Sequence, residues 1–197
     1  MSNMSVLIAN DIPGPAGGMV GRNRKGRESI ALGPLAVPIY WLSLFDSTHL
    51  VTFEEKDEDG MILTIPSLLA DIDDGRRLLW ERSQILSEWF PEFQPTWRRF
   101  ARRIDRLKSR YIKVDVLELW DLAAAVEQDF ESDLRRGVRW FESQDSDDFE
   151  RLLGLANINS YDPETRTFQS VGEDVPRAFH LRGYAYTNSA WDDKADT

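Results

Sequence analysis

Near the start of the chain, short runs rich in Val, Ile, Leu, Thr and Phe stand between polar or Gly- and Pro-containing stretches, which indicates β-strands. The pattern is present in residues 5–10 (SVLIAN), 49–55 (HLVTFEE) and 61–66 (MILTIP). KDEDG separates the last two stretches and ends in Asp-Gly, a turn signal, so this pair predicts a β-hairpin. The Gly- and Pro-rich sequence around residues 11–29 predicts a mobile loop.

From about Ser67 the apolar residues recur every three or four positions, which indicates amphipathic helices. We expect one helix with Asp73 or Asp74 as its N-cap, ending at Phe90-Pro91. The other predicted helices cover about 37–45, about 95–111, a segment that starts after Asp115 and continues or restarts through Phe141, and the stretch DDFERLLGLA capped by Ser146. The predicted inward face of the segment after Asp115 consists of Val116, Leu119, Trp120, Ala123, Val126 and Phe130.

The C-terminal part of the chain returns to short strand signals. YDPETRTFQSV predicts a hairpin around Asp-Pro, and residues 179–187 predict a further strand. The polar residues 192–197 are expected to form a frayed tail. The whole pattern predicts one α+β domain over residues 1–197, with a small, mostly antiparallel sheet packed against a bundle of about four helices.

The composition narrows the chemistry. There are no cysteines, which removes disulfides and thiolate chemistry, and two histidines are too few for a His-rich metal site. The longest apolar run, residues 30–45, contains Pro and Gly and is too short to cross a bilayer as a helix. No basic segment followed by a long apolar one opens the chain. We therefore expect a cytoplasmic protein with no cofactor, no metal and no membrane partner.

The acidic excess lies in the second half of the chain. Residues 1–110 carry 15 basic and 15 acidic side chains, whereas residues 111–197 carry 9 basic and 19 acidic ones, which accounts for the formal net charge of −10. Most of the excess lies in residues 115–150, which hold 12 acids and 3 arginines. A surface of this kind repels nucleic acid and attracts basic partners.

One stretch, RRFARRIDRLKSR at residues 98–110, has seven basic residues among thirteen. Its apolar residues fall on one helical stripe, so we expect an amphipathic helix with a solvated basic face. Its expected neighbour is the acidic helix that follows, because an antiparallel pair would place opposite charges side by side. No helix-turn-helix, RRM or zinc-finger signature accompanies the arginines, so we expect no nucleic-acid partner.

No motif in the chain nominates a reaction. Residues 21–26 have the spacing of a P-loop, but Arg27 and Glu28 follow where Lys and Ser or Thr are required. The acidic stretches KDEDG and SQDSDDFE lack the EF-hand pattern, and neither G-x-S-x-G nor H-E-x-x-H occurs. The sequence therefore predicts no catalytic residue.

Three stretches, MSNMSVLIANDIPG, VPIYWLSLF and GRRLLWERSQIL, resemble a family of uncharacterised bacterial proteins. Some members of that family are similar in size and genomic setting to immunity proteins of polymorphic toxin systems. The resemblance covers about the first half of the chain and rests on structural positions, so it transfers no functional residue. It implies a small cytoplasmic protein that binds another protein.

We therefore predict an immunity or antitoxin-type protein that neutralises a cognate toxin by occupying its basic active-site cleft with an acidic surface. The predicted contact residues are Asp129, Glu131, Asp133, Asp145, Asp147, Asp148 and Glu150, with Trp140 or Trp191 as anchors. For each acid, the alternative is a solvated face that pairs with residues 98–110.

Two other functions remain open. The first is an adaptor or secretion chaperone whose acidic surface shields a basic client. The second is an enzyme that acts on a small substrate. Its candidate residues are His180, Arg182 and Tyr184, because they would share one face of the predicted last strand.

Overall fold

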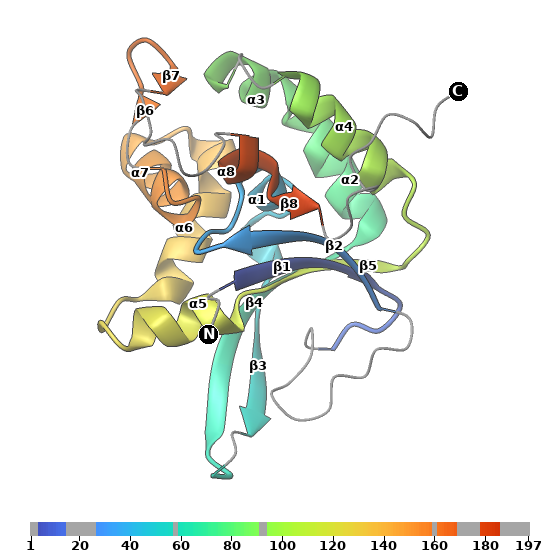
Figure 1. Cartoon of the computed structure of the whole chain (residues 1–197), viewed down its shortest axis with the longest axis vertical. Coiled ribbons are helices and arrows are strands. Elements are labelled where there is room, and N and C mark those ends of the chain that lie inside the picture. Colours follow the sequence, from blue (N-terminus) through green and yellow to red (C-terminus); the bar gives the residue numbers. More distant parts are fainter. Residues whose placement is uncertain are drawn as a thin grey trace.

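The computed structural model describes residues 4–14, 27–56, 59–90, 94–158, 161–168 and 178–185. Within these ranges, six strands form one antiparallel sheet in the order β3-β4-β5-β1-β2-β8, and two short strands form a separate hairpin (Figure 1). The strands are β1 (Met4–Asn10), β2 (Arg27–Pro34), β3 (Leu50–Lys56), β4 (Ile62–Asp71), β5 (Tyr111–Asp115) and β8 (Tyr184–Ala185) in the sheet, and β6 (Tyr161–Asp162) and β7 (Thr167–Phe168) in the hairpin.

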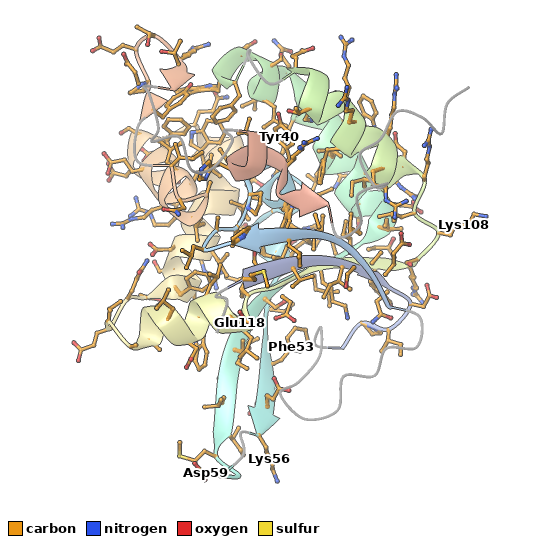
Figure 2. The ribbon with its side chains drawn as sticks, in the orientation of Figure 1. Tyr40, Phe53, Lys56, Asp59, Lys108 and Glu118 are labelled. Atoms are coloured by element: carbon orange, nitrogen blue, oxygen red, sulfur yellow. The ribbon has the colours of Figure 1, made fainter. Side chains whose placement is uncertain are left out.

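Eight α-helices within the described residues accompany this sheet. They are α1 (Ile39–Leu42), α2 (Ile72–Glu81), α3 (Ser83–Trp89), α4 (Gln94–Asp105), α5 (Leu117–Ala124), α6 (Phe130–Ser143), α7 (Ser146–Leu155) and α8 (Ala178–Arg182), with a 3-10 turn η1 (Ser47–His49) before β3. Figure 1 shows α2, α3 and α4 grouped on one side of the molecule and α5, α6 and α7 on the other, with α1 and α8 between them. The β3–β4 hairpin projects beyond the rest of the sheet, and Lys56 and Asp59 lie at its tip (Figure 2).

The predicted α+β class and the antiparallel sheet are confirmed. The strand at residues 5–10 and the hairpin built from 49–55 and 61–66 are present, but β4 continues to Asp71 where a helix was expected from Ser67. Ser67 pairs with Val51 of β3, and its hydroxyl donates to the Val114 carbonyl of β5 at 2.8 Å. Long-range pairing of this kind leaves no local signal. The N-cap of α2 is accordingly Asp71, which accepts from the Asp73 backbone N–H.

Breaks and a missed strand explain why the helices outnumber the four expected. The helix predicted to begin near Asp73 divides at Arg82 into α2 and α3. The predicted segment after Asp115 breaks at Glu127, whose φ is +56°, and restarts as α6. The helix predicted over about 95–111 ends at Asp105 instead. Tyr111 begins β5, which lies between β4 and β1 in the sheet, so it does not belong to the helical stripe.

Three further expectations need correction. The loop expected around residues 11–29 includes the start of β2, while its part from 15 to 26 lies outside the described residues, as does the predicted tail 192–197. The helix expected over about 37–45 is the single turn α1. The strand expected over 179–187 is replaced by helix α8 followed by the two-residue strand β8. The β6–β7 hairpin around Asp-Pro is confirmed.

The core joins the sheet to the helices of both groups. Trp41 of α1, Phe100 of α4, Leu134 of α6 and Val114 of β5 are all completely buried. Each large apolar side chain that leaves water contributes about 1.5–3 kcal/mol to folding. α4 therefore packs its apolar face against this core, as the stripe of apolar residues predicted.

One arginine is also buried in the core. Arg82, at the junction of α2 and α3, donates to the Ser43 carbonyl at 3.1 Å and pairs with Glu142 of α6 at 3.2 Å. Its guanidinium lies 4.8 Å from the centre of the Phe141 ring. Burial lowers the pKa of Arg82 to about 10, and the guanidinium remains charged at neutral pH. Arg82 thereby links the two helix groups.

Candidate protein-binding site

The basic and acidic helices do not form the predicted pair. α4 packs against α2 and α8, whereas α6 packs against α7. On α4, Arg103 forms an ion pair with Glu28 of β2. Acids of α6 and α7 instead pair mainly with arginines of these same two helices, and Glu142 pairs with Arg82. Strand β5 separates α4 from α5 in the chain, and the helices lie in different groups.

Asp148 fixes α7 against α6. Its carboxylate is completely buried and accepts from Arg139 Nε and Nη2, both at 2.7 Å, from Arg136 Nε at 2.9 Å and from Ser143 Oγ at 3.0 Å. The hydrogen bonds from Arg139 lead the effects that hold the pKa of Asp148 well below its usual range. A carboxylate enclosed in this way is a structural group, so the prediction that Asp148 contacts a partner is wrong for this structure.

Trp140, one of the two predicted anchors, is also buried. Its side chain is completely buried, and its ring centre lies 5.4 Å from that of Trp89 and 5.0 Å from that of Phe149. The aromatic cluster holds α3, α6 and α7 together, so Trp140 is a core residue and not a surface anchor. Trp191, the other predicted anchor, lies outside the described residues.

Four of the other predicted contact residues are exposed or partly exposed, and each has a local role. Asp129 and Asp145 cap α6 and α7, where they accept from backbone N–H groups of the first turn. Glu131 pairs with Arg135 at 2.9 Å, and Asp147 lies 3.7 Å from Arg136. These positions add to the negative surface, but the structure does not single them out.

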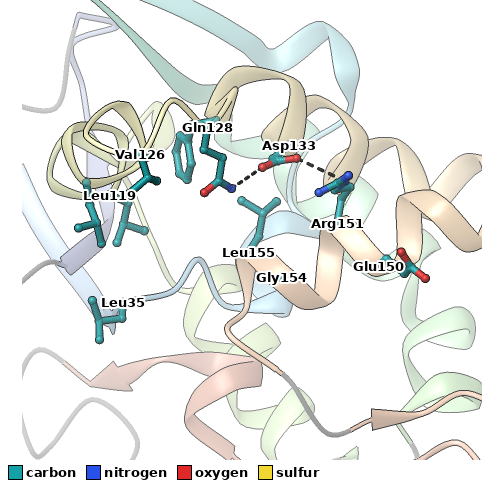
Figure 3. Close-up of a pocket in the computed structure, with 12 residues that line it drawn as sticks. Leu35, Leu119, Val126, Gln128, Asp133, Glu150, Arg151, Gly154 and Leu155 are labelled. Carbon is teal, nitrogen blue, oxygen red and sulfur yellow. Dashed lines mark hydrogen bonds and ion pairs between the residues drawn. The ribbon is translucent and has the colours of Figure 1, made fainter.

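The remaining two predicted acids, Asp133 and Glu150, line a pocket of about 310 Å³ between α5, α6 and α7 (Figure 3). We call it the α5–α7 pocket. Its apolar lining consists of Leu35, Leu119, Leu122, Ala123, Val126, Phe130, Gly154 and Leu155, and its polar lining of Gln128, Asp133, Glu150 and Arg151. The pocket is large enough for a substantial apolar group and lies within the size range of ligand sites.

The apolar residues at the mouth of the pocket are not covered. Leu122 is 44% exposed, Val126 68% and Leu35 52%. Leu35 also has a φ of +51°, a left-handed conformation that is unfavourable for a residue with a Cβ. Val126 was predicted to face inward, and this expectation is wrong, because α5 ends at Ala124 and the chain turns at Glu127.

The carboxylates at the rim differ in how they are held. Asp133 accepts from Gln128 Nε2 at 2.6 Å and lies 3.5 Å from Arg151 Nε, so its position is fixed (Figure 3). Within the described part of the chain, the carboxylates of Glu127 and Glu150 have no hydrogen bond or ion pair. Glu150 lines the pocket and Glu127 adjoins the lining residue Val126 in the chain, so two carboxylates that are unpaired in this part of the chain lie in or next to the pocket lining.

The three residues predicted for an enzyme site do not lie on one strand face. His180 and Arg182 lie on helix α8, so they do not share a strand face with Tyr184. His180 Nδ1 lies 2.9 Å from the Ala156 carbonyl, a contact that fixes α8 against the end of α7. Among the described residues, no group of three or more His, Asp or Glu side chains is placed to hold a metal ion. None of the described helices is both long and apolar enough to cross a membrane.

Comparisons with protein-family models, with curated proteins and with solved structures found no match. The α5–α7 pocket is therefore defined by its own geometry alone.

Sequence reasoning found the acids around this pocket but missed its apolar part. The stretch LELWDLAAAV at α5 is apolar on more than one side, which is more than one buried stripe requires. That excess was the available signal for Leu122. The positions of Leu35 and Gly154 in the pocket had no such signal, because they depend on how distant segments pack.

Proposed function

We propose that this protein binds and neutralises a cognate toxin, as an immunity protein of the antitoxin type, through the surface formed by α5, α6 and α7. The observation that carries the proposal is a pocket with an exposed apolar mouth and the carboxylate of Glu150, unpaired among the described residues, in its lining. An apolar centre with a polar, charged border is the usual anatomy of a protein–protein contact.

The charge of this surface supports a basic partner. Residues 117–155, which span α5 to α7, hold eleven acidic and four basic side chains, a net charge of −7. Such a field attracts a basic surface over several ångströms and raises the rate of association at low ionic strength. A toxin that acts on nucleic acid or nucleotides needs a basic cleft, which an acidic inhibitor can occupy.

The test begins with capture of the partner. The protein is used to capture chains from its own host at low ionic strength, and each captured chain is expressed in a bacterium that lacks both genes. The proposal expects one captured chain to arrest growth and this protein to restore it. A captured chain that is harmless, or a toxic one that this protein does not counteract, would contradict the proposal.

A charge variant links the rescue to the proposed surface. Glu127→Lys combined with Glu150→Lys should weaken rescue, since both carboxylates are exposed, Glu150 in the lining of the pocket and Glu127 next to the lining residue Val126 in the chain. The matched control is Glu54→Lys combined with Glu164→Lys, which makes the same charge change at exposed positions of β3 and the β6–β7 turn. Equal rescue by the two variants would argue against this surface.

The adaptor alternative is separated by genetics. Loss of an immunity protein harms the cell only when the toxin gene is present. Loss of a secretion chaperone would instead leave its client unexported and the cell viable.

A further inference from the structure

We infer that the partner inserts an amphipathic helix into the α5–α7 pocket, with one large apolar side chain filling it and Lys or Arg side chains beside it facing the rim. This inference rests on the proposed function, because it names the part of the partner that the same surface would hold.

The need for an apolar anchor follows from the pocket's floor. Leu119, Ala123, Phe130 and Leu155 are nearly buried and present only carbon to the cavity, so a polar group placed there would lose its water without gaining a partner. A large aliphatic or aromatic side chain would gain the free energy of leaving water. Fully enclosed anchors of this kind commonly dominate the binding energy of an interface.

A helix suits the backbone of the walls. The carbonyl of Ala123 accepts from the Val126 N–H at 3.1 Å and the Gln128 N–H at 3.0 Å. The Gly154 carbonyl accepts from Asn157 at 2.9 Å, and the Leu155 carbonyl from Val37 at 2.7 Å. These three carbonyls already have partners, whereas a helix satisfies its own backbone groups and needs no backbone partner from the walls.

The charge of the helix follows from the rim. Glu150 of α7 lines the pocket, and the exposed Glu127 lies in the chain between the lining residues Val126 and Gln128. A helix that carries Lys or Arg on both flanks of its apolar stripe would place a cation near each. A helix with acidic flanks would meet like charges and be repelled.

Gly154 makes the inference testable without disturbing the fold. It lies in the last turn of α7 at the edge of the pocket, and a Cβ added there would have no heavy atom within 4 Å. Gly154→Phe should therefore keep the protein folded and obstruct the pocket. Gly154→Ala is the matched small substitution, and Gln84→Phe places the same ring on an exposed position of α3.

The probe is a dye-labelled helical peptide with leucine along one stripe and arginine on both flanks. Its binding to the full chain is followed by fluorescence anisotropy at low ionic strength. We expect Gly154→Phe to weaken binding about tenfold or more, the loss typical of an obstructed anchor site. Gln84→Phe should bind like the parent protein, and Gly154→Ala should lose much less affinity than Gly154→Phe. A scrambled peptide of the same composition, which has no apolar stripe, and a peptide with glutamate in place of arginine should both bind much more weakly.

Three results would overturn the inference. Equal binding by Gly154→Phe and the parent protein would place the peptide elsewhere, and equal binding of the scrambled peptide would reduce the contact to charge alone. Self-association of the parent protein that Gly154→Phe abolishes would make a second copy the occupant.

The two proposals can fail separately. If Gly154→Phe still neutralises the captured toxin as well as the parent protein does, the proposed function stands and the helix inference is wrong. If no captured chain is toxic but the peptide series behaves as expected, the pocket holds a basic helix of another kind of protein, and the immunity function is wrong.

Discussion

α4 and α5 are both conspicuous in the sequence, but they treat their apolar residues in opposite ways. α4 buries Phe100, Ala101 and Ile104 completely. Its residues Arg98, Arg99 and Arg102 are exposed. α5 buries Leu119 and Ala123 but leaves Leu122 exposed, and Val126 just beyond its end is more exposed still. The helix with the denser charge is thus an ordinary amphipathic helix, and the helix with uncovered apolar surface marks the candidate site.

The charge density of a helix alone therefore did not indicate the candidate site. The basic residues of the 98–110 stretch surround an apolar face that the core fully uses, and Lys108, on the loop after α4, extends away from the body of the molecule (Figure 2). Exposed apolar residues around a cavity need a reason that solvated charges do not. Variants of both helices can test whether the apolar residues of α4 are core and those of α5 are surface.

Truncating each helix should separate core from surface. We expect Phe100→Ala to lower the free energy of unfolding by about 3–5 kcal/mol, because it opens a cavity in the core. Leu122→Ala should change the free energy of unfolding by less than about 0.5 kcal/mol, because this side chain is already half in water. Urea unfolding of the two variants measures both. Comparable losses would mean that α5 is packed in solution and that the contrast between the helices is wrong.

Neutralising two acids should separate structural carboxylates from those offered to a partner. Asp148→Asn should cost about 2 kcal/mol, less than a fully buried pair would, since Arg136 and Arg139 are partly solvated and can rehydrate. Glu150→Gln should leave the unfolding free energy nearly unchanged and weaken toxin binding instead. If Glu150→Gln proves the more destabilising of the two, the division of roles fails.

Acid should weaken the protein through Asp148 in particular. The pKa of this carboxyl is lower in the folded than in the unfolded protein, so its stabilising effect is complete above the unfolded value of about 3.9. The effect is lost as the pH falls through the folded-state value. The stabilities of the parent protein and Asp148→Asn, measured from unfolding curves, should therefore differ by a constant amount from pH 7 to pH 5, and the difference should begin to shrink as the pH falls from about 4 to 3. A difference that stays constant down to pH 3 would contradict the role of the α6–α7 ion cluster.

The smallest effect is expected at the pocket's edge. Gly154→Ala should raise the free energy of unfolding by about 0.5 kcal/mol, because alanine favours the helix and nothing opposes its Cβ. Thermal unfolding measures the change. A loss of stability would show that the pocket is closed in solution and would remove it as a binding site.

Local patterns predicted much of this fold. The stripe of α4 could be predicted from a few neighbouring residues, and so could the start of α7 to within one residue, although its N-cap is Asp145 and not the predicted Ser146. The course of β4 to Asp71 and the placement of β5 between β4 and β1 could not, since they depend on pairing between distant segments. The charge pattern pointed to Asp133 and Glu150, and both line the pocket that we propose as the binding site. Their separation from Asp148 and Trp140, which face the interior, required the packing of α7 on α6.

The most direct test of the account is the affinity of the captured partner for Gly154→Phe compared with Gln84→Phe, measured by titration calorimetry. We expect the affinity to fall about tenfold or more for Gly154→Phe and to stay unchanged for Gln84→Phe. Equal affinities for the two variants would contradict the claim that the α5–α7 pocket is where this protein binds its partner.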